Sequence, residues 1–197
     1  MKSFETRHEL VELPEVDPTF RLDVRYATSD NFIGRAVYTE ARAFLQKPAA
    51  EALLRVHRSL LPHGYGLLIF DGYRPWSVTK IFWDETPEEK RIFVANPESG
   101  SIHNRGCAID LGLHDLETGL EVEMPSAFDE MTERSYANYP GGTSESRQAR
   151  DLLRSSMEAQ GYEGIKFEWW HFNFKGWRDY PVLNLAFHEI EPALQTV

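Results

Sequence analysis

Two short segments, well separated in the sequence, carry side chains that bind metals and move protons. The first segment, Ser101–Asp110, holds one imidazole and one carboxylate, and the second, Glu168–His171, again holds one of each. A catalytic zinc site uses three protein ligands, an open position for water and a nearby carboxylate base. A fold that brings the two segments together would therefore be suited to a hydrolytic reaction.

The first segment must fold back if both of its candidate ligands are to reach one ion. A fully extended chain would separate His103 from Asp110 by ~23 Å at ~3.3 Å per residue. Residues 104–106, Asn-Arg-Gly, have turn chemistry, and Gly106 is free to adopt a positive φ. We predict a hairpin-like loop that places His103 and Asp110 side by side, followed by a buried strand over 108–113. A surface hairpin with a solvated His and Asp is an equally good interpretation of this segment alone.

The second segment lies in an aromatic stretch, residues 167–174, whose composition favours a strand over a helix. Glu168 and His171 are three residues apart, which puts them on opposite faces of a regular strand. A bulge or an irregular strand end is therefore needed to aim both at one point. The alternative is a core strand with Glu and His at its edges. Burying an ionised Glu beside aromatic rings is costly unless it is paired or functional, which favours the metal site.

The two segments form the pattern Ser-x-His-x-x-Gly-x-Ala-x-Asp followed by Glu-x-x-His. Further motifs accompany them at 25–28, 31–34, 65–75, 128–131, 133–135 and 167–171. From about residue 20 to the end, the chain resembles the zinc D-alanyl-D-alanine dipeptidases of the VanX type. This resemblance implies an α+β fold and a Zn²⁺-dependent hydrolase.

The resemblance also implies a role for each polar residue of the metal site, with one Zn²⁺ per chain. The zinc ligands would be His103, Asp110 and His171. Glu168 would be the catalytic base, and Arg74 would face the scissile carbonyl. These roles are chemically reasonable, because a carboxylate can relay a proton and a guanidinium can stabilise an oxyanion. The alternative for Arg74 is an ordinary surface ion pair with Asp71.

Three further positions would bind the ends of a small dipeptide substrate. By resemblance, Ser101 would meet the terminal carboxylate, while Tyr26 and Asp129 would meet the free ammonium. A helix N-cap or a loop position is the alternative for Asp129. The stretch from Trp83 to Ser101 is shorter than is typical of the family, which leaves the pocket wall and the size of substrate open.

The implied reaction is hydrolysis of D-Ala-D-Ala to two D-alanines. One alternative is a D,D-carboxypeptidase that acts on longer peptidoglycan peptides, and another is a non-catalytic zinc-binding module. Glu168 and Arg74 favour an enzyme, since a structural zinc has a closed fourth position. The sequence leaves open a role in glycopeptide resistance or in D-alanine recovery, and also the oligomeric state, a homo-oligomer included.

Charge and cysteine content narrow the class of protein. The chain has 21 Lys and Arg against 31 Asp and Glu, and a net charge of −10 argues against binding to nucleic acid or to an anionic membrane. The single cysteine, Cys107, excludes an internal disulfide; it is better interpreted as a small packing residue than as a nucleophile. Residues 1–9 hold no apolar run of signal-peptide length, and no later stretch is predicted to span a membrane. We therefore expect a cytoplasmic location.

We expect one α+β domain over residues 1–197, with a central antiparallel sheet and peripheral helices. The apolar spacing predicts a buried strand at 66–70. Helices are predicted at 47–62, 75–83, 86–95 and 144–160. The third of these depends on a capping box at Thr86-Pro87-Glu88-Glu89. Residues 121–139 are expected to be irregular.

Overall fold

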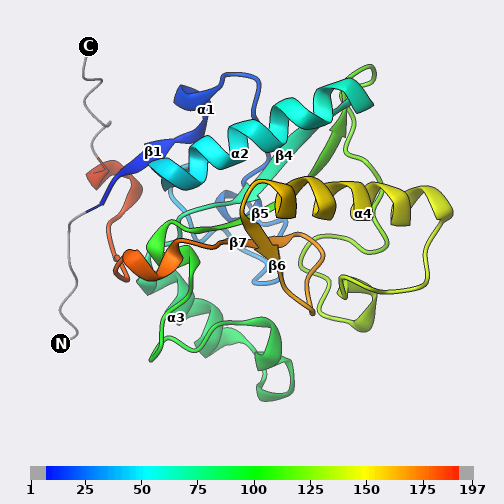
Figure 1. Ribbon diagram of the computed structural model, residues 1–197. Helices are drawn as coiled ribbons and strands as arrows, with labels where there is room; N and C mark the ends of the chain where they lie inside the picture. The colour runs from blue at the N-terminus through cyan, green and yellow to red at the C-terminus, as the bar shows by residue number, and fades with distance from the viewer. Residues whose placement is uncertain (1–7, 191–197) are drawn as a thin grey trace, which may run out of the picture.

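The computed structural model describes residues 8–190, and a five-stranded sheet lies at its centre (Figure 1). The strands, in spatial order, are β2 (Arg21–Leu22), β4 (Tyr65–Asp71), β5 (Ala108–Asp115), β7 (His171–Phe174) and β6 (Tyr162–Gly164). All neighbouring strands are antiparallel except β2 and β4, which are parallel. A second, two-stranded sheet pairs β1 (Leu10–Glu12) with β3 (Phe44–Gln46). The predicted α+β class is confirmed, with β2 as the exception to an antiparallel sheet.

Two amphipathic helices, α2 (Lys47–Leu60) and α4 (Ser144–Ala159), lie side by side against the sheet (Figure 1). Both were predicted from their apolar spacing. The short helix α1 (Leu13–Val16) precedes them, and α3 (Trp76–Glu85) lies apart from α2 and α4. Leu61, which the helix predicted over 47–62 includes, is 40% exposed, because α2 ends at Leu60 and the chain turns into a short 3-10 helix.

The helix predicted from the capping box at Thr86 is wrong. Thr86 Oγ1 donates a hydrogen bond to the carbonyl of Phe82 (2.6 Å), so the hydroxyl satisfies the end of α3 instead of starting a new helix. The chain continues as a 3-10 helix, Glu88–Phe93, which has no side-chain cap. Residues 121–139 are irregular as predicted, apart from the 3-10 helix Glu133–Ser135.

Strand register brings the polar residues of the site into one row. Asp110 lies between two fully buried residues of β5, Ile109 and Leu111, and alternation turns its side chain to the opposite face. Asp110 is opposite Asp71 on β4 and opposite His171 on β7. The pairing of β4 and β5 is irregular between Ile69 and Asp71, at the end of the strand where the site begins.

Residues 1–7 and 191–197 lie outside the described residues. The expectation that residues 1–9 hold no signal peptide, and the two ends of the domain predicted over 1–197, therefore fall largely outside the described chain. Within residues 8–190, no helix combines the length and the apolar character needed to cross a bilayer.

Candidate active site

His103 and Asp110 meet through a tight turn. His103 begins a 3-10 helix, His103–Arg105, and Gly106 follows with a φ of 66°, the left-handed value that its position was expected to need. The arm before the turn is not a strand, so the predicted hairpin is only half present. Both side chains are buried, at 2% and 3% exposure, which excludes the solvated surface hairpin.

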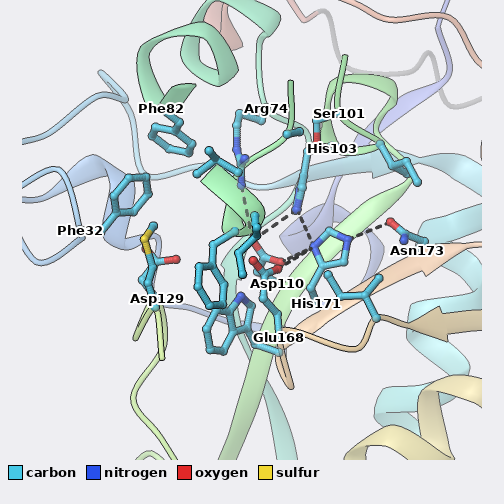
Figure 2. Close-up of a pocket in the computed structure, with 18 of the residues that line it drawn as sticks. Phe32, Arg74, Phe82, Ser101, His103, Asp110, Asp129, Glu168, His171 and Asn173 are labelled. Carbon is cyan, nitrogen blue, oxygen red and sulfur yellow. Dashed lines mark hydrogen bonds and ion pairs between the residues drawn. The ribbon is translucent and has the colours of Figure 1, made fainter. Parts of the chain in front are cut away.

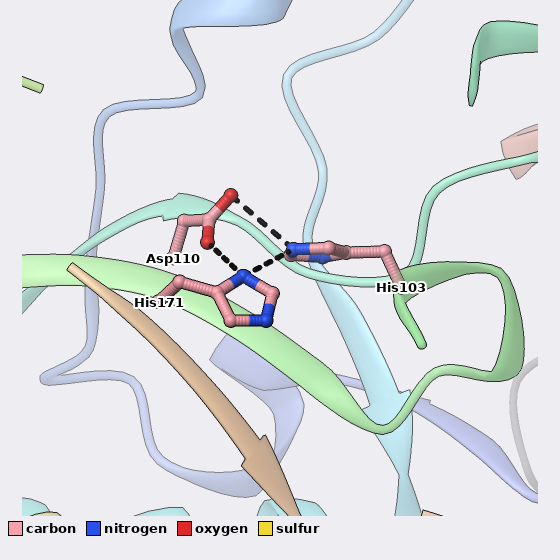
Figure 3. A group of neighbouring side chains, drawn as sticks. All are labelled: His103, Asp110 and His171. Atoms are coloured by element: carbon pink, nitrogen blue, oxygen red, sulfur yellow. Dashed lines mark hydrogen bonds and ion pairs between the residues drawn. The ribbon is translucent and has the colours of Figure 1, made fainter. Parts of the chain in front are cut away.

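Three side chains form a close triangle of ligand atoms (Figure 3). The distance from His103 Nε2 to His171 Nδ1 is 3.1 Å, and from His103 Nε2 to Asp110 Oδ2 it is 3.3 Å. His171 Nδ1 lies 2.9 Å from Asp110 Oδ1. A tetrahedral ion with bonds of ~2.0–2.1 Å has its ligand atoms ~3.3 Å apart, so the triangle has the dimensions of a zinc site.

The outer nitrogen of each imidazole is engaged by an acceptor. His103 Nδ1 donates to the carbonyl of Gly72 (2.7 Å), and His171 Nε2 donates to Asn173 Oδ1 (2.9 Å). In the neutral rings, these bonds leave lone pairs on the two inner nitrogens, which face each other and a carboxylate. Such a set repels itself unless a cation lies between its members. Two nitrogens and one carboxylate oxygen also fit the preference of zinc, so these residues suit the metal.

Glu168 enters the site from an irregular strand end, as its spacing from His171 required. Strand β7 begins only at His171, and before it the main chain is held from two sides. Trp169 N–H donates to the carbonyl of Ser135 (2.9 Å), and the carbonyl of Trp170 accepts from Leu111 N–H (3.1 Å). The predicted strand over 167–174 is therefore correct only for its second half.

Asp110, which belongs to the triangle, and Glu168, which lies beside it, have pKa values that are shifted in opposite directions. Burial opposes ionisation of Asp110, but His103 and His171 outweigh it and hold the pKa of Asp110 below its usual range. Burial raises the pKa of Glu168 to about 7, opposed by His171, whose Nδ1 lies 3.8 Å from Glu168 Oε2. A bound cation would act in the same direction as His171 and lower the pKa of Glu168. Glu168 is thus able to exchange a proton near neutral pH.

Arg74 is a buried residue, at 8% exposure, and not part of a surface ion pair. Its Nε and Nη2 both donate to Asp71 Oδ2, at 2.9 and 2.7 Å, and Nη2 also lies 3.5 Å from Asp110 Oδ2. The guanidinium carbon lies 4.7 Å from the ring centre of Phe82 and 5.4 Å from that of Tyr26. Within residues 8–190, Nη1 has no hydrogen-bond partner, which leaves it available to a ligand.

Asp129 is a partly buried residue, and the described chain gives a hydrogen-bond partner to only one oxygen of its carboxylate. Tyr26 Oη donates to Asp129 Oδ1 (3.0 Å), whereas Oδ2 is buried without a hydrogen-bond partner among the described residues. Burial raises the pKa of Asp129 well above its usual value, and the negative charge of Asp110 adds to this effect. Asp129 has a φ of 60° and caps no helix within the described part of the chain, so the N-cap alternative is wrong. The loop position is correct, because the residue lies in a turn.

All eight residues that the sequence analysis predicts for the site line a single cavity of about 300 Å³ (Figure 2). They are Tyr26, Arg74, Ser101, His103, Asp110, Asp129, Glu168 and His171. Figure 2 shows Arg74, His103 and Glu168 converging on Asp110 from different elements, with Asp129 toward one end of the cavity. The structure thus brings all eight predicted site residues together in one cavity.

The sequence interpretation missed several lining residues. Asn173 lies two residues after His171 in β7, so strand alternation was the signal that could have placed it on the same face. Five apolar side chains also line the cavity, and no polar pattern marked them: Phe32, Phe82, Val94, Met131 and Ile165. Residues 92–95 come from the stretch between Trp83 and Ser101, which therefore does form part of the pocket wall.

Cys107 is a packing residue, as predicted. Its side chain is fully buried, and burial raises the pKa of the thiol to about 12, so no thiolate forms near neutral pH.

Comparison with known proteins agrees with this geometry. Residues 6–188 match the model of the peptidase M15 family, described as D-Ala-D-Ala dipeptidase. This chain belongs to that family. The predicted resemblance is therefore confirmed, and the protein is a metallopeptidase.

Several D-alanyl-D-alanine dipeptidases are similar over most of their length. The protein from Escherichia coli K12 is 38% identical over 175 residues, which cover 89% of each chain. The protein from Enterococcus faecium is 39% identical over 193 residues, which cover 89% of this chain and 94% of the relative. The one from Enterococcus faecalis is 41% identical over 172 residues, 77% of this chain and 84% of the relative. Membership supports D-Ala-D-Ala dipeptidase activity.

Proposed function

We propose that this chain hydrolyses D-Ala-D-Ala to two D-alanines at one zinc ion held by His103, Asp110 and His171. The observation that carries the proposal is the triangle of inward-facing lone pairs, 2.9–3.3 Å apart, beside a carboxylate that titrates near neutrality. Zinc at this position would act as a Lewis acid and supply a water that ionises near neutral pH.

Glu168 is the proposed general base and acid. Its partly buried carboxylate lies beside the triangle, with Oε2 3.8 Å from His171 Nδ1, and burial raises its pKa above the usual carboxyl value. It therefore takes a proton from the attacking water onto a carboxylate oxygen and then delivers it to the nitrogen of the leaving D-alanine.

Arg74 is proposed to hold the oxygen of the scissile carbonyl as it becomes an oxyanion. Two nitrogens of the guanidinium, Nε and Nη2, are fixed on Asp71, so the third nitrogen, Nη1, points in a defined direction. The surrounding rings of Phe82 and Tyr26 exclude water, which strengthens the interaction with a developing charge.

The two ends of the dipeptide are proposed to meet Asp129 and Ser101. A substrate ammonium would give Asp129 Oδ2 the partner that it lacks, and Tyr26 fixes the other oxygen. Ser101 is buried in the opposite part of the site, beside His103, where its hydroxyl can donate to a carboxylate. The cavity volume of about 300 Å³ suits a small dipeptide as the substrate.

The experiment that tests this function compares three substrates: D-Ala-D-Ala, its N-acetyl derivative and a pentapeptide that ends in D-Ala-D-Ala. We expect fast release of D-alanine from the free dipeptide and very slow release from the other two. Comparable kcat/KM for all three would instead support the D,D-carboxypeptidase alternative. Zinc analysis of the purified protein should give about one ion per chain.

A further inference from the structure

Asn104, the residue next to His103, has a side chain whose hydrogen bonds all lie inside the protein. It is fully buried, at 0% exposure, although turn chemistry alone would place it at a surface. Its Oδ1 accepts from Ser101 N–H (2.8 Å), and its Nδ2 donates to the carbonyl of Arg74 (2.8 Å) and to Thr79 Oγ1 (2.8 Å). One amide therefore joins the turn that carries His103 to the segment that carries Arg74.

The main chain of Arg74 is held on both sides by this turn. Arg74 N–H donates to the carbonyl of His103 (3.1 Å), while the carbonyl of Arg74 accepts from Asn104. Residues 72–75 lie between the end of β4 and the start of α3, so no strand or helix ladder fixes Arg74 there. The side chain of Asn104 supplies the hydrogen bond to the carbonyl of Arg74 that a strand or helix would otherwise supply.

We infer that Asn104 is a positioning residue that sets Arg74 relative to the metal-binding triangle and to Ser101. The inference rests on the proposed function, in which Arg74 stabilises the oxyanion. An interaction that strengthens in the transition state is sensitive to small displacements, and a shift of ~1 Å can cost ~10²-fold in rate. The effect of losing Asn104 should accordingly fall on kcat, whereas the link to Ser101 should affect KM.

Two substitutions separate these links. Asn104→Asp keeps an oxygen to accept from Ser101 N–H but removes the donor to the carbonyl of Arg74. We expect kcat to fall by about 10- to 100-fold with KM within about threefold of wild type. Asn104→Leu removes both links without introducing a buried carboxylate, so kcat should fall similarly and KM should also rise. Both variants should retain about one zinc per chain.

Gln46→Leu is the matched control. Gln46 is also a fully buried amide, and its Nε2 donates to the carbonyl of Arg105 (2.9 Å), so it braces the same turn without touching Arg74. We expect it to lower the melting temperature as much as Asn104→Leu while kcat stays within about threefold of wild type. Equal losses of kcat in the two Leu variants, or an unchanged kcat in both Asn104 variants, would overturn the inference.

Arg74→Lys distinguishes failure of this inference from failure of the proposed function. A point charge cannot reproduce the guanidinium fork, so this variant should lose most of its turnover. If Arg74→Lys is fully active, the proposed role of Arg74 is wrong, and the inference about Asn104 is wrong with it. If Arg74→Lys is impaired but the Asn104 variants turn over normally, the inference alone is wrong.

Discussion

Two of the carboxylates that line the cavity, Asp110 and Asp129, have opposite surroundings. Asp110 is on β5, with its oxygens 2.9 and 3.3 Å from imidazole nitrogens, and its pKa lies below the usual range. Asp129 is in the irregular segment before α4, accepts one hydrogen bond from Tyr26 and has one oxygen without a partner in the described chain. Burial raises its pKa well above the usual value.

This difference indicates which carboxylate the chain itself keeps ionised and which carboxylate depends on a ligand for a partner. Around Asp110, the protein itself supplies the groups that favour the ionised form. Around Asp129, it supplies burial and a single donor, an arrangement that is costly unless a cation arrives. Asp129 also has a left-handed φ of 60°, which costs a non-glycine residue about 1 kcal/mol or more. Unfavourable features of this kind are typical of binding sites.

Removing a proposed zinc ligand from the Asp110 half should give the largest effect. His171→Ala deletes one vertex of the triangle, and the two remaining ligands cannot hold zinc against water and buffer. We expect zinc content to fall from about one per chain to nearly none, with activity at background. Metal analysis after dialysis provides the measurement. Normal zinc content in this variant would place the metal elsewhere and remove the basis of the comparison.

The next largest effect should come from Glu168→Gln, which keeps the shape of the side chain but removes its proton exchange. Turnover should fall by ~10²–10⁴-fold, because that is the usual contribution of a general acid–base residue. Zinc content should stay at about one per chain, in contrast to His171→Ala. Activity within a few-fold of wild type would show that Glu168 is not the base.

The Asp129 half should control discrimination between free and acylated substrates. An uncompensated buried charge costs ~3–5 kcal/mol, or ~10²–10³-fold or more in kcat/KM. Wild type should prefer D-Ala-D-Ala over N-acetyl-D-Ala-D-Ala by at least that factor. Asp129→Asn should slow cleavage of the free dipeptide much more than that of the acylated one, so the ratio narrows. A ratio that does not change would mean that Asp129 does not bind the ammonium.

The sequence predicted the Asp110 half better than the Asp129 half, for a physical reason. The fold-back at Gly106 and the irregular end before His171 follow from local geometry and side-chain alternation. Burial of Asp129 with one unsatisfied oxygen depends on an irregular segment and on Tyr26, 103 residues away in sequence. No local pattern encodes such a contact, and only the family resemblance pointed to it.

The errors in the fold have a related origin. The capping box at Thr86 was correct as a local pattern, but the hydroxyl completes α3, which ends beside it. The sequence places Asn104 only in a turn, because two of its three side-chain hydrogen bonds reach Arg74 and Thr79, which are 30 and 25 residues away in sequence. Hydrogen-bonding capacity is visible in a sequence, whereas the choice of partner is a property of the packed chain.

The smallest predicted effect is on stability, and it tests the comparison without any substrate. Because the pKa of Asp129 is raised in the folded chain, the folded state retains a proton that the unfolded state releases above the ordinary carboxyl pKa. The free energy of unfolding therefore falls as the pH rises from the ordinary carboxyl pKa toward the raised pKa of the folded state. Asp129→Asn has no proton to release, so it avoids this loss of stability. At pH 7 its melting temperature should exceed that of wild type by about 2–4 °C for each ~1 kcal/mol gained in the free energy of unfolding.

The gain from Asp129→Asn should shrink as the pH falls toward ~4, where the unfolded carboxyl also binds a proton. Asp115→Asn is the control of opposite sign, because hydrogen bonds from Thr118 lower the pKa of this exposed carboxylate. It should not stabilise the protein at pH 7. Thermal melts at pH 4 and pH 7 provide the comparison. A stabilisation by Asp129→Asn that is equally large at pH 4, or absent at pH 7, would show that burial does not raise the pKa of Asp129 in the folded protein.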